Sequence, residues 1–244
     1  MHVMITGASK GIGLAIATCF ADAEKNMSLS LCAREESQII EAKRSLEVEF
    51  PSMKILAARC DVSQEQDVKH FVREAEQSFG GIDILINNAG FGLFKSVTDL
   101  SAEEFDRVLG TNLRGVFLIT QAVLPGMKDR RSGTIVSISS LAGRNGFAGG
   151  AAYCASKFGM RGLMQSLFLE VREFGIRVIT IFPGSVDTNF FDTAGHPLGS
   201  SAPDALRAED VAAAVHATVM LPASATISEL DIRPTNPQKS VPKP

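Results

Sequence analysis

One tyrosine and one lysine are spaced so that they could act as an acid–base pair. The chain holds 15 Phe but a single Tyr, Tyr153, and Lys157 follows it by four residues. The segment 155–173 has apolar residues at helical spacing and no proline, so residues four apart share a face and the phenol and ammonium can converge. A nearby cation lowers a phenol pKa that is ordinarily about 10. Lowering it to near 7 takes roughly 4 kcal/mol, which one unit charge ~4 Å away supplies at an effective dielectric of ~20.

The pair therefore predicts a general acid/base, in which Tyr153 exchanges a proton and Lys157 adjusts its acidity. On spacing alone, an ordinary amphipathic helix that carries both residues is the better explanation, because Y-x-x-x-K is a weak pattern. The functional assignment depends on the elements that must position the pair.

Strand-like and helix-like runs alternate from end to end. The strand-like runs are 2–6, 28–33, 54–58, 83–87, 133–139, 176–182 and 226–232, and the helix-like runs are 11–24, 36–50, 64–79, 101–127, 151–173 and 208–221. This alternation predicts βαβ units in a single doubly wound Rossmann-type α/β domain, with a parallel sheet of about seven strands flanked by helices on both faces. The long helix is expected to kink near residues 110–112. No linker divides the chain, so residues 1–232 are expected to form one domain, followed by a Pro-rich tail at 233–244.

Composition is that of an ordinary soluble globular protein. The chain has 244 residues, 45% apolar and 21% charged, and its net charge of −3 gives no electrostatic footprint for nucleic acid or membrane. Four cysteines (Cys19, Cys32, Cys60 and Cys154) without a C-x-x-C pair argue against a metal site or disulfide framework and suit a reducing compartment. With no signal-peptide pattern and no run of transmembrane length, we expect a cytoplasmic protein without a metal.

A glycine-rich turn lies between the first expected strand and the first expected helix. Glycines there let the backbone turn tightly and approach a pyrophosphate at the positive end of a helix. The spacing is G-x-x-x-G-x-G rather than the standard G-x-G-x-x-G, and taken alone it fits a plain strand-to-helix turn equally well. Its place in the first βα unit favours dinucleotide binding. The residues expected to contact the cofactor are Gly7, Ser9, Lys10, Gly11, Ile12 and Gly13.

The end of the second expected strand bears on which dinucleotide binds. An acidic residue about 20 positions after the glycines accepts the ribose hydroxyl of NAD, but Ala33 stands there, followed by Arg34. An adenosine 2′-phosphate attracts cations, and Arg34 can bind it bidentately beside Lys10. NADP is therefore expected rather than NAD. The alternative is that both cations are solvated and Glu35 or Glu36 turns toward the ribose.

Several further short motifs follow in a definite order, each near an expected strand end or in its expected helix. The set is Thr6-Gly7-x-x-x-Gly11-x-Gly13, Asp61-Val62, Asn87-Asn-Ala-Gly90, Asn112, Ser140, Tyr153-x-x-x-Lys157 and Pro183-Gly184. Each motif is weak alone, but together and in this order they are highly specific. On these residues the chain resembles, from about residue 3 to residue 232, the classical short-chain dehydrogenase/reductase family.

The resemblance implies a catalytic set of Asn112, Ser140, Tyr153 and Lys157. Ser140 would help polarise a substrate carbonyl, while Ser139 is expected to be structural. A helix kink at Asn112 would free a backbone carbonyl that binds a water of the proton relay. Lys157 would also donate a hydrogen bond to the nicotinamide ribose.

The resemblance also implies further cofactor contacts along the chain. They are Asp61 (to the adenine amino group), Val62, Asn88, Ala89, Gly90, Tyr153, Lys157, Pro183, Gly184, Val186 and Thr188. Taken locally, Asp61 fits an N-cap or turn aspartate equally well. The stretch 87–90 likewise fits a generic turn, and 183–188 fits a plain strand-ending loop.

The implied activity is an NADP(H)-dependent oxidoreductase that transfers hydride between nicotinamide and a small ketone, aldehyde or secondary alcohol, with Tyr153 exchanging the proton. The partner is a small molecule, and family habit implies a homodimer or homotetramer with the helices at 101–127 and 151–173 between subunits. The segment 189–206 is expected to cover the substrate. Arg144, Asn145 and Phe147 are candidates for the pocket mouth.

Two rival functions stay open. A 3-oxoacyl-thioester reductase remains possible, although the ending at 227–235 lacks the Gly-Gly-bearing segment common among acyl-carrier reductases and resembles members acting on small hydroxy acids, pterins or other carbonyls. A non-catalytic NADP sensor or scaffold on the same fold is the rival from another class, which the presence of Ser140, Tyr153 and Lys157 disfavours.

Overall fold

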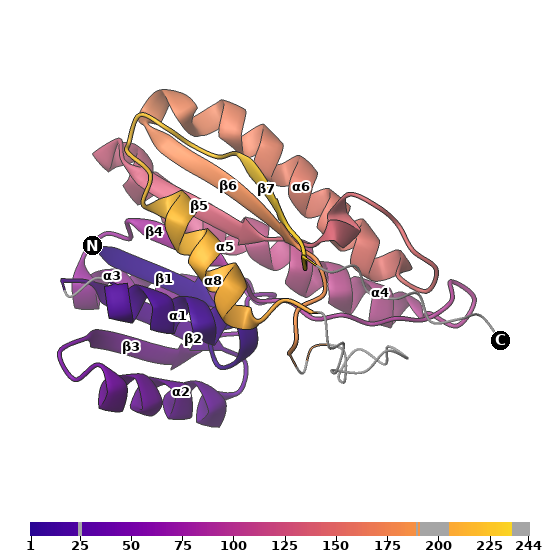
Figure 1. The fold of residues 1–244 in the computed structure, drawn as a ribbon, viewed down its shortest axis with the longest axis horizontal. Coiled ribbons are helices and arrows are strands. Elements are labelled where there is room, and N and C mark those ends of the chain that lie inside the picture. Colours follow the sequence, from indigo (N-terminus) through magenta and orange to yellow (C-terminus); the bar gives the residue numbers. More distant parts are fainter. Residues whose placement is uncertain (24–25, 189, 191–204, 236–244) are drawn as a thin grey trace.

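The computed structural model describes residues 1–23, 26–188, 190 and 205–235. Its centre is one parallel sheet of seven strands in the order β3-β2-β1-β4-β5-β6-β7 (Figure 1). The strands are β1 (His2–Thr6), β2 (Ser28–Ala33), β3 (Lys54–Arg59), β4 (Ile84–Asn87), β5 (Gly133–Ile138), β6 (Ile176–Pro183) and β7 (Glu229–Ile232). Ile5 of β1 lies opposite Leu31 of β2 and Ile86 of β4. The predicted fold class is confirmed.

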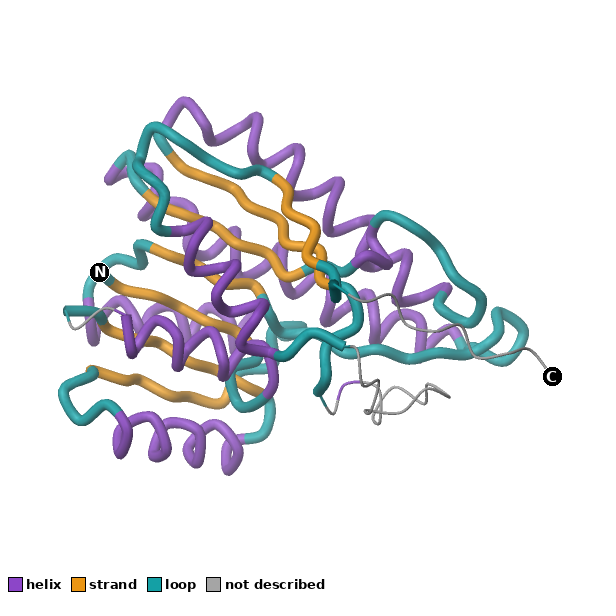
Figure 2. The backbone as a smooth tube through the Cα atoms, in the orientation of Figure 1, coloured by secondary structure: helices purple, strands orange, loops and turns teal. Residues whose placement is uncertain are grey.

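Helices cover both faces of the sheet (Figure 2). They are α1 (Gly11–Ala23), α2 (Glu36–Glu49), α3 (Glu65–Phe79), α4 (Ala102–Leu109), α5 (Gly115–Arg130), α6 (Ala151–Val171) and α8 (Ala208–Val219), with the short turns η1 (Gly110–Arg114), η2 (Leu141–Gly143) and η3 (Arg172–Phe174). Buried residues of α1, α2 and α8 share one apolar core, and those of α3, α5 and α6 share another. Val3 and Ile5 of β1 join the first core and Met4 joins the second. The central strands are therefore apolar at successive positions, as a sheet covered on both faces requires.

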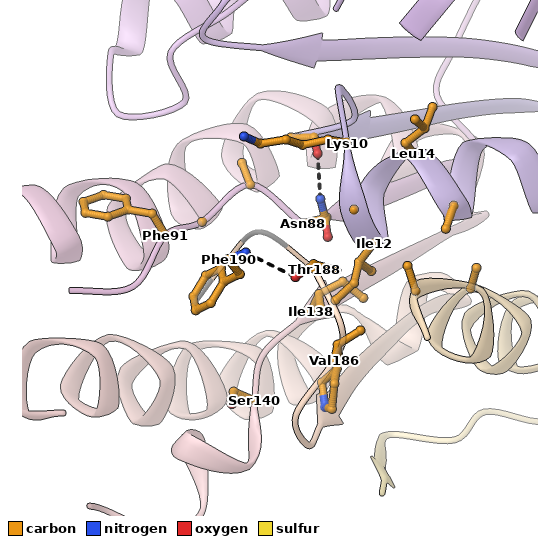
Figure 3. Close-up of a pocket in the computed structure, with 18 of the residues that line it drawn as sticks. Lys10, Ile12, Leu14, Asn88, Phe91, Ile138, Ser140, Val186, Thr188 and Phe190 are labelled. Atoms are coloured by element: carbon orange, nitrogen blue, oxygen red, sulfur yellow. Dashed lines mark hydrogen bonds between the residues drawn. The ribbon is translucent and has the colours of Figure 1, made fainter. Parts of the chain in front are cut away.

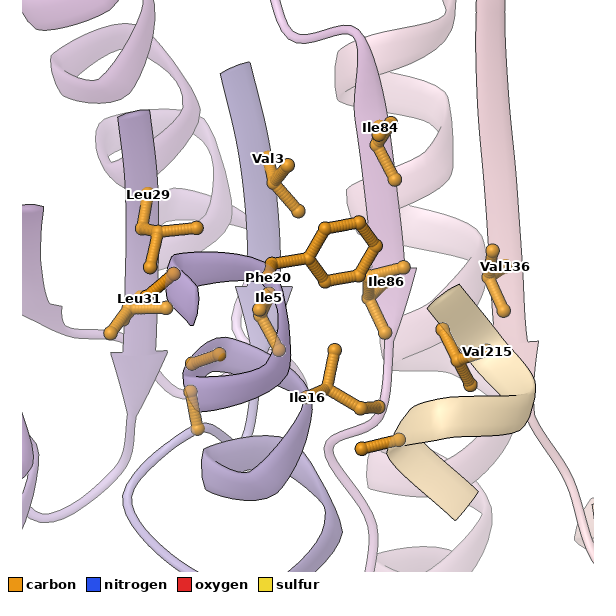
Figure 4. Packing of buried hydrophobic residues seen from close by; sticks show 14 of the residues in the cluster. Val3, Ile5, Ile16, Phe20, Leu29, Leu31, Ile84, Ile86, Val136 and Val215 are labelled. Carbon is orange, nitrogen blue, oxygen red and sulfur yellow. The ribbon is translucent and has the colours of Figure 1, made fainter. Parts of the chain in front are cut away.

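Phe20 of α1 lies at the centre of the first core (Figure 4). Its side chain is fully buried and points toward Ile86 of the sheet. The ring also meets the His216 ring of α8 edge-on, with centroids 5.2 Å apart. This packing holds α1, and with it the glycine-rich turn that precedes α1, against the sheet and α8.

The long helical run is interrupted where the sequence predicts a kink. α4 begins at a capping box, in which the Ser101 hydroxyl accepts from the Glu104 amide and the Glu104 carboxylate accepts from the Ser101 amide. Between α4 and α5, η1 is a π-helical turn. A π-turn breaks the regular i→i−4 hydrogen bonding, so the predicted kink is confirmed.

The stretch 102–130, which includes this turn, is the part of the described chain that is both long and apolar enough to cross a membrane. Half of its most apolar window is buried inside the domain. Core helices of soluble proteins pass the same test, so the stretch is weak evidence for a membrane span.

The observed elements differ from the expected ones mainly at their ends. β7 begins at Glu229 rather than at residue 226, because its ladder to β6 starts only at Thr180. The expected substrate loop at 189–206 lies outside the described residues except for Phe190, Ala205 and Leu206. The expected tail at 233–244 is described only to residue 235.

Truncating Phe20 is expected to destabilise the protein strongly. Phe20→Ala leaves a cavity between α1 and the sheet and should lower the free energy of unfolding by about 3–5 kcal/mol. As a control, Val48→Ala on the outer face of α2, where the side chain is 82% exposed, should change it by less than about 0.5 kcal/mol. Urea denaturation followed by circular dichroism measures both. Equal effects of the two substitutions would contradict this account of the core.

Candidate active site

A cavity of about 1520 Å³ is lined in large part by residues at and just after the carboxyl ends of the strands, and it extends along α1 as far as Asp22. β1 lies between β2 and β4 in the sheet, so the chain reverses its direction of winding here, where open α/β sheets bind their ligands. The volume exceeds the 300–1,000 Å³ usual for one small ligand, so a dinucleotide and a second molecule have room. Figure 3 shows Lys10 and Asn88 on one side of the cavity and Ser140 on the other, with Thr188 between them.

Most of the predicted site residues line this cavity. Those that do are Gly7, Ser9, Lys10, Gly11, Ile12, Arg34, Val62, Asn88, Ala89, Gly90, Ser140, Tyr153, Lys157, Pro183, Gly184, Val186 and Thr188. The other three predicted residues, Gly13, Asp61 and Asn112, do not line it.

The glycine-rich turn packs tightly on the loop after β4. The Asn88 side-chain amide donates to the carbonyls of Thr6 (3.0 Å) and Gly7 (2.9 Å), and the Thr6 hydroxyl accepts from the backbone amides of Asn88 and Ala89. A side chain at Gly13 would strike the Gly7 carbonyl and the Asn88 amide group, and Gly7 itself has φ +65°. Glycine is therefore required at both positions, and the turn leads directly into the N-terminus of α1, the end of a helix that attracts a pyrophosphate.

Asn112 is buried, and its side chain is occupied in holding the backbone. Its Oδ1 accepts from the Phe91 amide at 3.0 Å, while its Nδ2 donates to the Phe91 carbonyl and to the Ser156 hydroxyl. These bonds tie the loop after β4 to η1 and α6. The side chain therefore acts as a positioning group, and the relay through a backbone carbonyl stays a prediction.

Asp61 forms a local turn just after β3. Its Oδ1 accepts from both the amide (2.9 Å) and the hydroxyl (2.8 Å) of Ser63. This oxygen of Asp61 is therefore engaged in a local turn, which is the alternative role that the sequence leaves open for Asp61. Its neighbours Cys60 and Val62 line the cavity, and the contact of Asp61 with an adenine amino group stays a prediction.

Two guanidinium groups flank one aromatic ring in the cavity wall. The guanidinium carbon of Arg34 lies 5.8 Å from the Phe91 ring centroid, and that of Arg107 lies 5.5 Å from it. Arg107 comes from α4 and was not predicted, since no local pattern marks it. Glu35 lines the cavity and Glu36 does not. If a carboxylate rather than Arg34 contacts the ribose, Glu35 is therefore the remaining candidate of the two.

Tyr153 and Lys157 are both buried on α6, with 8% and 4% of their surface exposed. The Lys157 Nζ donates to the Ile138 carbonyl, at the end of β5, at 2.8 Å and lies 5.7 Å from the Tyr153 ring centroid. Burial lowers the pKa of Lys157 to about 7, because the ammonium is solvated poorly away from water. Charged and uncharged amine are therefore both populated near neutral pH.

The predicted acidification of Tyr153 by Lys157 is wrong for this structure. Burial raises the pKa of Tyr153 to about 12, and a hydrogen bond with Ser140 offsets that rise only in part. The spacing in the sequence predicts that the two groups are near each other, but it does not predict that both are buried away from solvent. A dry site disfavours the phenolate and the ammonium alike.

The Ser140 hydroxyl lies beside the tyrosine and also caps η2. Its Oγ accepts from the Ala142 amide at 3.1 Å, and Ser140 is near enough to the Tyr153 phenol to offset part of the rise in its pKa. Ser139 is buried and also lines the cavity, so its expected structural role stays a prediction. Its amide donates to the Ile181 carbonyl at 2.8 Å.

Arg144, at the end of η2, points away from the cavity. Its guanidinium donates to Asp231 (2.5 Å) and Glu229 (2.9 Å) of β7 and lies 3.9 Å from the Phe182 ring centroid. Arg161 of α6 donates to the same Glu229 carboxylate at 2.9 Å. Of the three candidates for the pocket mouth, Asn145 and Phe147 line the cavity and Arg144 does not. Arg144 instead anchors the turn that follows Ser140.

The site therefore combines a glycine turn suited to a pyrophosphate with a hydroxyl pair and an amine in one cavity. This combination can hold a dinucleotide and move a proton at the atom where a second molecule reacts. Phe94, which packs against Tyr153 with ring centroids 5.6 Å apart, also lines the cavity. It was missed because nothing in the sequence around Phe94 sets it apart from a core phenylalanine.

Comparison with known proteins agrees with this geometry. A family model described as short chain dehydrogenase matches residues 1–198. A sepiapterin reductase from Chlorobaculum tepidum is 35% identical over 244 residues, which cover 96% of each chain. A 3-ketodihydrosphingosine reductase from Bos taurus is 36% identical over 194 residues, which cover 78% of this chain and 58% of that protein.

Solved structures show the same likeness over almost the whole chain. An alcohol dehydrogenase from the archaeon Thermococcus sibiricus, complexed with 5-hydroxy-NADP, has a TM-score of 0.88 at 29% identity and covers 98% of this chain and 99% of its own. A metagenomic short-chain oxidoreductase in complex with NADP has a TM-score of 0.83 at 31% identity, with coverages of 97% and 98%. The motifs, the fold and these relatives agree, and the chain belongs to the short-chain dehydrogenase/reductase family of oxidoreductases.

Proposed function

We propose that this protein reduces the carbonyl group of a small ketone or aldehyde, or oxidises the corresponding alcohol, with NADP(H). The observation that carries the proposal is that Tyr153, Ser140 and Lys157 line the same cavity as the glycine-rich turn. Two relatives are named as reductases, which supports the same class of reaction.

The proposed chemistry needs one proton at the substrate oxygen. When bound, the nicotinamide supplies or accepts the hydride. Tyr153 donates the proton to the carbonyl oxygen during reduction, since its phenol is protonated at neutral pH. The Ser140 hydroxyl, which lines the cavity beside Tyr153, orients the same oxygen and polarises the carbonyl. Lys157, held by the Ile138 carbonyl, stabilises the negative charge left on the phenol once a bound anionic cofactor has raised the pKa of the amine and keeps it charged.

The choice of NADP rests on the charges at the nucleotide end. Arg34 and Arg107 share the Phe91 ring, and Lys10 lies in the glycine turn. All three cations line the cavity. A 2′-phosphate adds negative charge that such cations bind, and the two solved neighbours contain NADP or its 5-hydroxy derivative.

Removing the phenol hydroxyl is expected to stop turnover while the cofactor still binds. Tyr153→Phe should lower kcat by about 10²–10⁴-fold, the usual contribution of a positioned acid or base. NADPH binding, followed by its fluorescence, should change little. The assay monitors NADPH oxidation with a panel of small ketones and with an acetoacetyl thioester, so a thioester reductase is recognised by its substrate. Tyr153-independent activity would contradict the mechanism, and a protein that binds NADPH without oxidising it on any substrate would be a sensor.

Removing the Arg34 charge is expected to weaken NADPH selectively. Arg34→Gln loses a charge-assisted bond of about 1.5–3 kcal/mol and should raise the Kd of NADPH about 10- to 100-fold with little change for NADH. Arg44→Gln, an exposed arginine on α2, serves as the control and should leave both constants unchanged. If the unaltered protein binds NADH more tightly than NADPH, the expected preference for NADP is contradicted. The adenosine ribose would then be bound by Glu35 instead of Arg34.

Binding of NADPH is expected to take up protons between pH 7 and 8. The pKa of free Lys157 is about 7, so much of the amine is uncharged there, and a polyanionic ligand in the cavity raises that pKa. Calorimetric titrations in buffers of different ionisation enthalpy measure the protons taken up. Lys157→Met should abolish the uptake. Proton release on binding, or equal uptake by the variant, would contradict the assignment.

A further inference from the structure

Phenylalanine rings surround Tyr153 at the end of the cavity where the substrate must react. The ring centroids of Phe94 and Phe190 each lie 5.6 Å from that of Tyr153, and Phe147 lies 5.6 Å from Phe94. The interplanar angles of 79°, 56° and 54° are edge-on or tilted rather than stacked. All three phenylalanines line the cavity. We call Phe94, Phe147 and Phe190 the aromatic wall.

The backbone makes room for the aromatic wall. A side chain at Gly92 would come within 2.9 Å of the Phe190 ring and 3.0 Å of the Phe94 ring, and one at Gly150 would come within 2.5 Å of the Phe147 ring. Neither glycine has a positive φ, so neither is required by backbone conformation. A side chain at either position would instead displace the rings, which therefore pack directly on the main chain and come from three separate segments.

The lining also restricts the charge of the substrate. Among the described residues that line the cavity, the Lys and Arg side chains besides Lys157 are Lys10, Arg34 and Arg107. Lys10 belongs to the glycine turn, and the two arginines lie over Phe91. The described residues thus place no second cation beside Tyr153 to bind a carboxylate of the substrate.

We propose that the substrate is a neutral carbonyl compound whose carbonyl is attached to a flat aromatic ring, and that the aromatic wall binds this ring. This inference rests on the carbonyl chemistry proposed above and names its substrate class. Aromatic rings prefer edge-on or offset contacts with other rings, and such pairs contribute beyond the area they bury. An aliphatic substrate chain would pack as favourably against leucine or isoleucine side chains as against phenylalanine rings. Among the described residues, a hydroxy acid or other anion would find no cation beside Tyr153 other than Lys157 to pair with its charge.

A matched pair of ketones tests the aromatic wall. Acetophenone and cyclohexyl methyl ketone share one carbon skeleton and differ in whether the ring is flat and aromatic. The two ketones differ in intrinsic reactivity, so the readout is how a substitution changes the ratio of their kcat/KM values. Phe94→Leu should shift this ratio against acetophenone by about 2- to 13-fold, the loss of one aromatic pair of 0.5–1.5 kcal/mol. Phe147→Leu, whose side chain is 43% exposed, provides a second variant in case Phe94→Leu folds poorly.

Phe174→Leu is the control. Phe174 lies in η3, before the amino end of β6 and outside the cavity lining, so the ratio should not change. If both ketones are reduced in a Tyr153-dependent way and neither wall variant changes the ratio, the aromatic inference is overturned while the reductase function stands.

If neither ketone is reduced, the proposed reduction of simple ketones fails. The inference about the aromatic wall is then tested separately, by ligand binding. The Tm of the complex with NADP⁺ is then measured with 1-phenylethanol and with 1-cyclohexylethanol. The aromatic wall predicts a larger Tm shift with the phenyl alcohol, and a smaller difference between the two alcohols in Phe94→Leu. Equal shifts in the unaltered protein would overturn it.

Discussion

A buried amine sets the conditions for the rest of this active site. The Lys157 ammonium lies almost wholly out of water and has the Ile138 carbonyl as a hydrogen-bond partner. One neutral acceptor compensates little of the solvation that the charge loses, so its pKa falls to about 7. Any anion that enters the cavity restores the charge. In the proposed mechanism, binding of an anionic cofactor and proton donation by Tyr153 are thus linked through one side chain, with no conformational change required.

The two halves of the site are held in register by hydrogen bonds rather than by the cofactor. Asn88 and Thr6 join the glycine turn to the loop after β4, and Asn112 joins the next residues of that loop to α6 at Ser156. The nucleotide end and the acid–base end are therefore connected by a continuous chain of backbone-directed side chains. Such prior organisation lowers the ordering cost of binding.

Much of the fold and of the site could be predicted because the signals are local. Apolar runs, the glycine turn and the π-turn near Asn112 lie within short windows of sequence, and the family resemblance puts them in order. The contacts that decide the electrostatics join distant segments. The Lys157–Ile138 bond crosses from α6 to β5, and burial, which no spacing reveals, reversed the expected shift of the Tyr153 pKa. The aromatic wall could not be predicted for the same reason, since its rings come from three separate segments that only the fold brings together.

The bond between Arg144 and β7 has a consequence for the order in which the protein is made. The turn that carries Ser140 is anchored through Arg144 to Glu229 and Asp231, more than eighty residues further along the chain. Chains are synthesised and begin to fold from the N-terminus, so the strands that build the nucleotide end emerge from the ribosome long before these two carboxylates. The nascent protein can therefore shape its glycine-rich turn early, while the serine turn gains its ionic anchor only after β7 has been synthesised.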